Sequence, residues 1–314
     1  MKYSQQNNIR KSTVNLGVEK IEKPFLSIVI GTHNSEEYIE RCIKSLISQS
    51  CPRKEFEIIV IDDGSTDRSV ELSRNSGADL VIKTDPCTIS KARNLGVKNS
   101  KGKFLAFIDS DCEANDGWVN SIIKELQELP AITGPVLNGN SHNRVAWAEY
   151  FLEFGEFHER KKRSQIRFMP GCNGAFRRET FLQAGGFPDL RASEDVLLGE
   201  SLKKAQVGIQ FIPEVKIKHL CRTNLQRVRA NMELLGKYFV RTRQKEPSTP
   251  YSFLIKNKSL IGLIFIFKIF ISAKHAIKAK KAFKFLSSFP FIVVGVFSFC
   301  KGIFKEINLQ RNSQ

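Results

Sequence analysis

The sequence lacks the cysteine pattern of a disulfide-stapled or zinc-binding protein. Its seven cysteines are an odd number, and no two of them form a C-x-x-C pair. Small secreted domains use even sets of cysteines, and structural zinc sites use closely spaced pairs. The pattern argues against both classes and favours a reducing compartment.

The sequence also has little that resembles a leader, an internal repeat or a low-complexity tract. Residues 1–24 are polar and contain no apolar h-region, so we expect a polar lead-in rather than a signal peptide. With 314 residues, of which 41% are apolar, the chain is long enough for one large domain with an appendage.

Acidic residues are scarce in one part of the chain. Residues 201–314 contain 22 Lys and Arg but 4 Asp and Glu, a net charge of +18, whereas residues 1–200 carry −1. Such asymmetry indicates an anionic partner, either a membrane surface or nucleic acid. The basic residues alternate with long aliphatic runs instead of stacking platforms, so we expect lipid and no nucleic acid.

What the sequence does contain is an alternation of apolar strands and helices, which indicates an α/β fold with a mostly parallel sheet covered by helices on both faces. We place this domain at residues 25–245, ahead of the breaker cluster 246–250 and a helical region at 251–314. The patterns predict strands at 26–31, 56–62, 79–83, 104–109 and 131–138; helices at 35–49, 89–99 and 116–129; a helical region at 140–165; a strand–loop–strand at 168–176; helices at 178–184 and 193–205; and a strand pair within 209–219.

Two pairs of carboxylates follow predicted strands. Asp62 and Asp63 end one strand, and Asp109 and Asp111 end another. Parallel strands bring their carboxyl ends to the edge where open α/β sheets bind ligands. Asp-Ser-Asp also suits an ordinary turn, but four converging carboxylates would repel unless a divalent ion or the hydrogen-bond donors of a nucleotide relieved them. Hard oxygen donors suit Mg²⁺ or Mn²⁺, usually shared with substrate phosphates.

Two cationic or titratable side chains are expected near this edge. Arg93 lies one helix before the Asp109 strand, where a guanidinium binds a diphosphate or holds an aspartate in place; an ordinary surface arginine fits the pattern equally well. His219 ends a short alternating strand. Its imidazole suits Mn²⁺ or a donor phosphate, although a lone histidine is more often an ordinary polar residue.

Two further motifs have both a structural and a functional interpretation. Gly171 and Gly174 suggest a backbone that approaches a ligand closely, or a plain β-turn. Glu194 and Asp195 open a predicted helix, where the helix dipole explains one carboxylate well and two less well. Either of them is a candidate general base for an acceptor hydroxyl.

Six stretches carry a family resemblance because they occur in a fixed order. They are LSIVIGTHN at 26–34, IIVIDDGSTD at 58–67, ISKARNLGV at 89–97, FLAFIDSD at 104–111, GCNGAFRRETFLQAGGF at 171–187 and SEDVLLG at 193–199. Over about residues 25–222 the chain resembles inverting glycosyltransferases of family two. The resemblance implies the GT-A fold, a Rossmann-like and mostly parallel α/β sheet.

The resemblance also implies roles for individual positions. Asp63 would bind the donor nucleobase, and Asp195 would be the catalytic base with Glu194 beside it. The metal, Mn²⁺ or Mg²⁺, would be held by Asp109, Asp111 and His219. The donor nucleotide would be bound by Thr32, Asn34, Asp62, Asp63, Arg93, Asp109 and Ser110. The acceptor-side loop would include Trp118, Gly171, Asn173 and Gly174.

One departure from the family pattern narrows the expected activity. Processive members carry a Gln-x-x-Arg-Trp box after the base, and the nearest stretch here, residues 225–229, lacks the tryptophan. We therefore expect a non-processive enzyme that transfers one sugar, most simply from a UDP-sugar, to a hydroxyl acceptor. The acceptor would be a glycan or a lipid-linked molecule, in cell-surface polysaccharide or glycolipid synthesis.

Two other function classes are weaker alternatives. A nucleotidyltransferase that makes sugar nucleotides would be expected to carry a basic, Gly-rich loop after the first strand, and no Lys or Arg occurs there before Arg41. A membrane-docked module that binds nucleotide sugars without turnover would be expected to lack Asp111 or Asp195, and both are present.

The C-terminal region predicts membrane association at the cytoplasmic face. Residues 259–273 and 285–300 are strongly apolar but interrupted by Lys268 and Pro290, and five lysines lie between the two runs. Two crossings would place those lysines outside, against the positive-inside rule. Peripheral docking, re-entry or a single span remain, with a helical hairpin packed on the domain as the soluble alternative.

Overall fold

The strands of the chain form from short, largely apolar runs, as in LSIVIGT at residues 26–32, where every residue is buried. A computed structural model describes residues 24–311, so residues 1–23 of the expected polar lead-in lie outside it. The strands are β1 (Leu26–Thr32), β2 (Phe56–Asp63), β3 (Leu80–Thr84), β4 (Phe104–Ile108), β5 (Cys112–Ala114), β6 (Ala131–Thr133), β7 (Val136–Asn138), β8 (Ser164–Ile166), β9 (Asn173–Arg177), β10 (Ile209–Phe211) and β11 (Ile217–His219).

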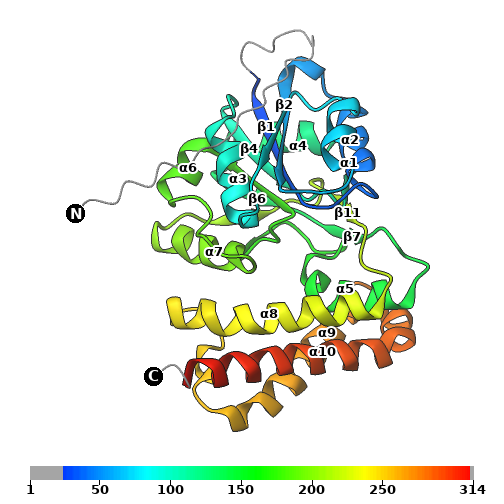
Figure 1. Ribbon diagram of the computed structural model, residues 1–314, viewed down its shortest axis with the longest axis vertical. Coiled ribbons are helices and arrows are strands. Elements are labelled where there is room, and N and C mark those ends of the chain that lie inside the picture. Colours follow the sequence, from blue (N-terminus) through cyan, green and yellow to red (C-terminus); the bar gives the residue numbers. More distant parts are fainter. Residues whose placement is uncertain (1–23, 312–314) are drawn as a thin grey trace.

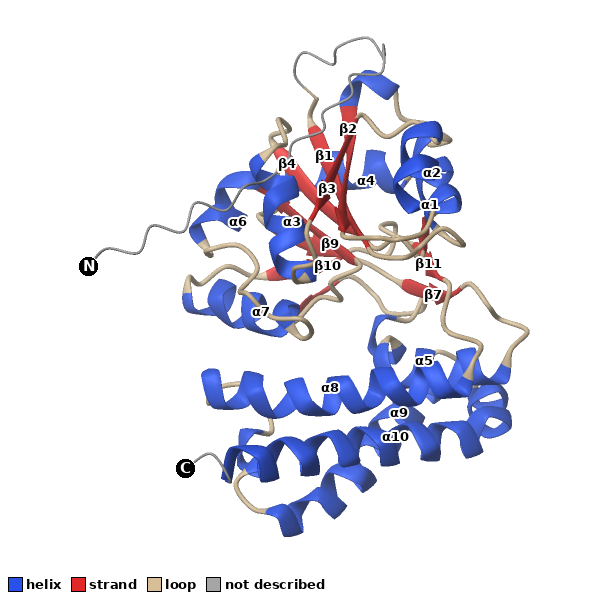
Figure 2. Ribbon diagram, in the orientation of Figure 1, coloured by secondary structure: helices blue, strands red, loops and turns tan. Residues whose placement is uncertain are grey.

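Helices follow most of the strands and continue alone at the C-terminal end. They are α1 (Ile39–Ile47), α2 (Ser69–Asn75), α3 (Ile89–Lys98), α4 (Trp118–Leu126), α5 (Arg144–Glu153), α6 (Arg178–Gln183), α7 (Glu194–Lys204), α8 (Leu225–Lys245), α9 (Ile261–Lys278) and α10 (Ala282–Arg311), with short 3₁₀ turns η1 (Arg53–Glu55), η2 (Gly155–Phe157), η3 (Ser252–Ile255) and η4 (Lys258–Leu260). Figure 2 shows the strands gathered in one half of the molecule and a layer of helices in the other.

The main sheet has eight strands in the order β3-β2-β1-β4-β9-β6-β10-β8. Strands β3, β2, β1 and β4 are mutually parallel, while β9 runs antiparallel to both of its neighbours. A second sheet of three short strands, β5-β11-β7, lies beside it. The predicted α/β class with a mostly parallel sheet is therefore confirmed.

Side chains of β1 alternate between two apolar layers, because successive residues of a strand point to opposite faces of the sheet. Ile28 and Ile30 belong to the larger core with residues of α1 and α4. Val29, between them, packs in a second core with Val97 of α3 and Phe181 of α6. Helices thus cover both faces, as predicted.

Two expected elements are divided between the sheets. The predicted strand 131–138 splits into β6 of the main sheet and β7 of the small one. Gly134 lies at the division, where an added Cβ would stand 2.0 Å from the carbonyl oxygen of Val215. The predicted strand pair within 209–219 is likewise β10 and β11 of different sheets, so the pairing was wrong.

Residues 140–165 are less helical than predicted. Only α5 and the short turn η2 are helical there, and β8 occupies residues 164–166 at the edge of the main sheet. The predicted strand before the loop at 168–172 is also absent, and β9 begins only at Asn173.

The C-terminal helices form a separate layer below the sheets, in which α8, α9 and α10 lie side by side with α5 (Figure 1). Two glycines allow α8 and α10 to approach closely. An added Cβ at Gly236 of α8 would stand 2.0 Å from the carbonyl oxygen of Phe299, and one at Gly302 of α10 would stand 2.0 Å from that of Glu233. The layer therefore has its own backbone-to-backbone packing.

Candidate functional site

The predicted carboxylates meet at one edge of the main sheet. Strand β1 lies between β2 and β4, and its last residue, Thr32, pairs with Asp62. Asp63 ends β2, and Asp109 and Asp111 follow β4 directly. The parallel order of the three strands thus gathers these side chains at their common carboxyl edge, as the sequence predicted.

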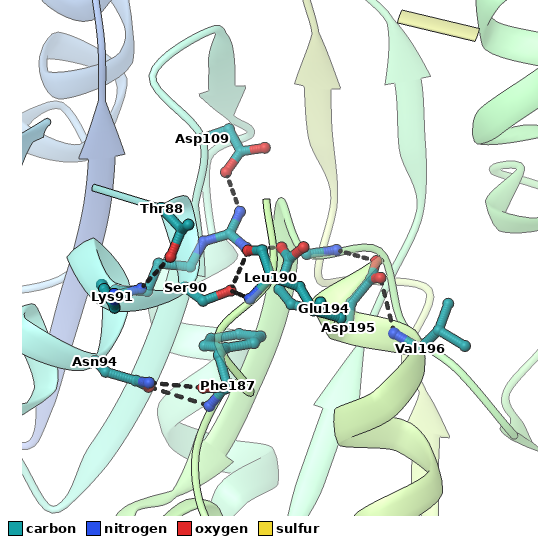
Figure 3. Close-up of polar contacts among 12 residues, drawn as sticks. Thr88, Ser90, Lys91, Asn94, Asp109, Phe187, Leu190, Glu194, Asp195 and Val196 are labelled. Carbon is teal, nitrogen blue, oxygen red and sulfur yellow. Dashed lines mark hydrogen bonds and ion pairs between the residues drawn. The ribbon is translucent and has the colours of Figure 1, made fainter. Parts of the chain in front are cut away.

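A buried arginine connects this edge to the start of α7. Arg93 of α3 is 2% exposed, and its Nη2 donates to Asp109 Oδ1 while its Nη1 donates to Glu194 Oε1, both at 2.5 Å. In Figure 3, Asp109 and Glu194 reach the guanidinium from two different elements. Of the interpretations open for Arg93, the structure supports the one in which it holds an aspartate in place.

The charges around Arg93 favour its ionised form. Burial lowers the pKa of Arg93, but the carboxylates of Asp109 and Glu194 outweigh burial and raise this pKa above its usual range. The guanidinium also lies over the ring of Phe187, with 5.2 Å between its Cζ and the ring centroid. Two carboxylates and an aromatic face therefore fix Arg93 in one position.

Helix α3 also anchors the loop that leads into α7. Asn94 Nδ2 donates to the carbonyl oxygen of Phe187, and Phe187 N donates back to Asn94 Oδ1. Ser90 Oγ donates to the carbonyl of Leu190 at 2.7 Å, and Thr88 Oγ1 donates to Asp189. The polar residues of the Ser-x-x-Arg-Asn stretch thus position the loop that delivers the two acidic residues of α7 (Figure 3).

Asp195 has the environment of a general base. Its Oδ2 accepts a hydrogen bond from Gly171 N at 3.1 Å, and its Oδ1 accepts one from Val196 N at 2.8 Å. Burial, reinforced by the neighbouring charge of Glu194 and opposed by Arg93, raises the pKa of Asp195 to about 7. A carboxylate with a pKa near neutrality is well matched to proton abstraction.

One group of side chains could hold a metal ion. Asp111, Cys112 and His219 place a ligand atom each within 4.8 Å of one another. His219 Nε2 is 3.5 Å from Asp111 Oδ1, and its Nδ1 is buried without a hydrogen-bond partner. Burial raises the pKa of Cys112 well above its usual value, so this thiol stays neutral. A carboxylate oxygen and an imidazole nitrogen remain, which fit Mn²⁺ or Mg²⁺ shared with a ligand's phosphates.

Four of the residues predicted for the donor lie together at the ends of β1 and β2. Thr32 Oγ1 and Asp62 Oδ1 are buried without a hydrogen-bond partner. Asp63 Oδ1 accepts a hydrogen bond from Cys87 N, and the side chain is half-exposed. Asn34, whose φ is +48°, accepts from Thr66 N at 2.9 Å. Unsatisfied buried polar atoms next to half-exposed ones suit a ligand that supplies the missing partners.

Ser110, also predicted for the donor side, contacts protein instead. Its Oγ donates to Ser35 Oγ at 2.9 Å, and the residue is 8% exposed. Its position between Asp109 and Asp111 fixes the turn that carries both carboxylates.

Three residues predicted for an acceptor-side loop are part of the interior. Trp118 is fully buried, and its Nε1 donates to Asn173 Oδ1 at 3.0 Å. Asn173 Nδ2 donates to carbonyl oxygens of the neighbouring 134–136 and 214–216 backbone, so both side chains are already satisfied. Gly174 lies within β9, where an added Cβ would stand 2.5 Å from Met169 Sδ. All three residues therefore make structural contacts within the protein, and their acceptor-side role stays a prediction.

Gly171 does lie in the site, but its close neighbours are protein side chains. An added Cβ would be 3.0 Å from Arg93 Nη1 and 3.3 Å from Glu194 Oε1. Its N–H is also the one that holds Asp195. A glycine here therefore allows the backbone to approach the buried ion pairs.

Sequence reasoning missed a second charge pair next to the metal group. Glu149 of α5 is fully buried and accepts hydrogen bonds at 2.5 Å from both N and Nη1 of Arg222. Phe154 packs on the His219 ring, with centroids 4.6 Å apart. The sequence signal was a lone glutamate inside the aromatic run WAEYF, where a carboxylate is buried only when paired.

A cavity of about 690 Å³ lies between the sheets and the layer of C-terminal helices, and Arg93, Gly171 and Arg222 are among the residues that line it. Asp109, Asp111, Glu194, Asp195 and His219 lie along one wall. The opposite wall is built by residues of α8, η3, α9 and α10. The site is therefore shared between both halves of the molecule, which the sequence did not indicate.

The first half of the chain matches a known family. The family model described as "Glycosyl transferase family 2" matches residues 27–183, which are half of the chain. The chain is 26% identical to glycosyltransferase AglE of Haloferax volcanii over 199 residues, covering 61% of this chain and 66% of that protein. It is 36% identical to the poly(ribitol-phosphate) β-N-acetylglucosaminyltransferase TarS of Staphylococcus aureus over 90 residues, 27% of this chain and 16% of that one. The chain thus spans only part of the length of these relatives.

Solved structures share the fold at low sequence identity. Mannosyltransferase PcManGT of Pyrobaculum calidifontis, described in complex with GDP-Man and Mn²⁺, has a TM-score of 0.60 at 15% identity, covering 90% of this chain and 87% of that one. Residues 1–349 of S. aureus TarS with UDP-GlcNAc have a TM-score of 0.50 at 18% identity, covering 92% of each. The predicted GT-A fold is confirmed.

Proposed function

Because the chain belongs to glycosyl transferase family 2, we propose that it transfers one sugar, with inversion, from a nucleotide sugar to a hydroxyl acceptor. The observation that carries this proposal is the cluster around Arg93. One buried guanidinium holds Asp109, on the donor side, and Glu194, next to the base, in a fixed relation. A single displacement needs this arrangement, since nucleophile and leaving group must lie on opposite faces of the sugar.

Asp195 acts on the acceptor in this proposal. Its carboxylate takes the proton of the acceptor hydroxyl while the hydroxyl oxygen forms a bond to the anomeric carbon. The bond from that carbon to the diphosphate breaks, and the nucleoside diphosphate leaves with the electron pair. Main-chain N–H groups of Gly171 and Val196 fix the orientation of the carboxylate. Glu194 stays paired with Arg93 and sets the electrostatic environment of Asp195.

Asp111 and His219 would hold a divalent ion together with the donor diphosphate. Such an ion, when bound, stabilises the negative charge that develops on the leaving group. The two side chains supply one oxygen and one nitrogen ligand. The Nδ1 atom of His219 is buried without a hydrogen-bond partner, so no hydrogen bond at that atom fixes the position of the ring. One carboxylate oxygen of Asp109 pairs with Arg93, and the other would bind a ribose hydroxyl or the metal.

A UDP-sugar is the proposed donor. The half-exposed carboxylate of Asp63 can accept from a base N–H, and Thr32 and Asp62 have buried oxygens without partners. TarS is described with UDP-GlcNAc and PcManGT with GDP-Man, so both bases occur on this fold. Asp63 accepts equally from the N3–H of uracil and the N1–H of guanine, and the uracil assignment is the part of the proposal most easily tested.

Docking on the cytoplasmic face of a membrane completes the proposal, with a glycan or lipid-linked acceptor. Helices α9 and α10 expose large apolar side chains, among them Ile266, Phe270, Ile277, Phe283, Leu286 and Phe297, each at least 64% exposed. Lysines flank this surface and suit anionic lipid headgroups. Of the described helices, α10 alone is long and apolar enough to cross a membrane, but its packing on α8 and α5 favours lying at the interface over spanning.

The test is a turnover assay with a panel of sugar nucleotides in the presence of Mn²⁺. Release of free nucleoside diphosphate, through slow hydrolysis or transfer to an added acceptor, identifies the donor. We expect one UDP-sugar to react well above the rest. Absence of both binding and turnover for every UDP- and GDP-sugar would overturn the proposed function.

A further inference from the structure

The wall of the cavity opposite the catalytic carboxylates contains two cations without acidic partners. Arg243 of α8 and Lys268 of α9 both line the cavity and are only partly exposed. Arg243 donates to the carbonyl oxygens of Pro250 and Phe239, and Lys268 Nζ donates to that of Leu152. Within residues 24–311, neither forms an ion pair with a carboxylate, although every other strongly buried arginine discussed above does.

Aromatic rings take the place of counter-ions at both positions. Arg243 Cζ lies 3.4 Å from the ring centroid of Phe239, and Lys268 Nζ lies 4.4 Å from that of Phe299. Cation–π contacts compensate only part of the cost of removing a charge from water. Burial lowers the pKa of Arg243 to about 9 and lowers that of Lys268, to which the charge of Arg243 contributes. Each cation therefore lacks a carboxylate in direct contact.

One carboxyl group of the cavity acts on Lys268 without forming an ion pair with it. Glu153 lines the cavity and accepts a hydrogen bond from Asn231 Nδ2 at 2.8 Å, and its charge opposes the lowering of the pKa of Lys268. Burial, together with the charge of Glu149, raises the pKa of Glu153 to about 8, so it is largely protonated at neutral pH. The positive end of the cavity is thus compensated only in part by the described chain.

Apolar side chains surround the two cations on the side away from the sheet. This part of the cavity is lined by Leu234, Leu235, Phe239, Leu254, Ile264, Phe267, Ile271 and Phe299. Phe267 is also 44% exposed, next to the exposed residues Leu263, Ile266 and Phe270. The apolar end of the cavity therefore adjoins the exposed apolar surface of α9.

We propose that this chamber binds an anionic amphiphile, whose phosphate lies between Arg243 and Lys268 and whose apolar chain lies among α8, α9 and α10. This inference rests on the proposed function and specifies its acceptor class. A lipid-linked glycosyl phosphate would place its sugar hydroxyl at Asp195, its phosphate at the two cations and its chain toward the membrane surface. All three chemical environments line the same cavity.

The experiment uses the full chain and isothermal calorimetry with three probes. They are n-octyl phosphate below its critical micelle concentration, n-octanol, and inorganic phosphate. We expect n-octyl phosphate to bind and the other two to bind at least tenfold more weakly, because only it carries both features. Equal binding of n-octanol would reduce the chamber to a hydrophobic pocket, and equal binding of phosphate would reduce it to a plain anion site; either overturns the inference.

Matched variants locate the binding. Arg243→Gln and Lys268→Met should each weaken n-octyl phosphate at least tenfold, whereas Arg229→Gln and Lys274→Met, exposed on the same two helices, should not. Equal affinity in all four variants would overturn the inference.

UDP binding with Mn²⁺, measured on each variant, confirms folding and separates the two proposals. If UDP binds and n-octyl phosphate does not, only the acceptor class fails. If neither UDP nor GDP binds the wild type, the proposed function fails.

Discussion

The buried cations on the two walls of the cavity have different partners. In the sheet domain, Arg93 is enclosed by two carboxylates of the same chain, and Arg222 is held by Glu149 at the junction. In the helical layer, Arg243 and Lys268 have carbonyl oxygens and aromatic rings but no carboxylate. The first arrangement is complete and can fix catalytic geometry, whereas the second is complete only with a ligand.

The two regions also differ in what they expose. The core strands β1, β2 and β4 are buried almost throughout. Helices α9 and α10 leave many large apolar residues exposed, within a segment that carries most of the net positive charge. In our proposal, one half of the molecule supplies the chemistry, and the other supplies a surface for an amphiphilic partner.

The largest expected effect comes from the catalytic carboxylate of the sheet domain. Asp195→Asn should keep nucleotide binding and lose about 10²–10⁴ in transfer rate, because the amide cannot accept the acceptor proton. Steady-state turnover with the donor found in the panel measures it. Near-normal turnover would remove Asp195 from this role, and Glu194 would then have to be tested in the same way.

Removing Arg93, the cation that Asp109 and Glu194 share, should test how much these ion pairs stabilise the fold. Arg93→Met leaves Asp109 and Glu194 buried near each other without a counter-ion, which should lower the free energy of unfolding by about 3–5 kcal/mol. Urea denaturation measures the change. Arg41→Met is the matched control, because the Arg41–Glu113 pair is exposed and should contribute about 1 kcal/mol or less. Equal effects for both variants would contradict the central position given to Arg93.

Membrane docking should depend on the helical layer and not on the sheet domain. Phe270→Ser removes a ring that is 64% exposed, and we expect vesicle affinity to fall about tenfold. Phe25→Ser, at 45% exposure on the sheet domain, should leave it unchanged. Co-sedimentation with anionic vesicles provides the measurement. High salt should release the wild type from the vesicles only in part, since apolar insertion is not screened by salt. Wild-type protein that does not bind the vesicles at all would contradict docking.

The pH profile sharpens the assignment of the base. The raised pKa of Asp195, about 7, means that the carboxylate needed for proton abstraction is lost as pH falls through that value. Turnover at saturating metal and donor should therefore rise about tenfold per pH unit below 7 and level off above it. A flat profile between pH 5 and 8 would show that no group with this pKa limits the reaction.

The sequence predicted the sheet edge well because strand order and carboxylate position follow from local patterns. The apolar runs at β1, β2 and β4 each end in polar residues. Because these strands pair in parallel, their polar ends meet at the same edge of the sheet. Arg93 was found, but its partner Glu194 lies 101 residues away, and no spacing rule connects them. The contact between Trp118 and Asn173 could not be predicted, because a hydrogen bond between distant buried side chains leaves no mark in either local sequence.

The helical layer was the least predictable part of the site. The run at residues 259–273 and the lysines after it indicate a surface, not a chamber wall. Only tertiary packing, with Gly236 and Gly302 drawing α8 and α10 together, encloses Lys268 beside Phe299. The domain limits at residues 25, 245 and 251 stay predictions, although α8 packs with the C-terminal helices rather than on the main sheet.

The most direct test of the central claim, a donor site completed by a metal at Asp111 and His219, is calorimetric UDP binding with Mn²⁺ and with chelator. We predict tight binding to the wild type with Mn²⁺, at least tenfold weaker binding with chelator, and equally weak binding to Asp111→Asn in both conditions. Equal UDP affinity of the wild type with and without metal, or undiminished metal-dependent affinity in Asp111→Asn, would contradict it.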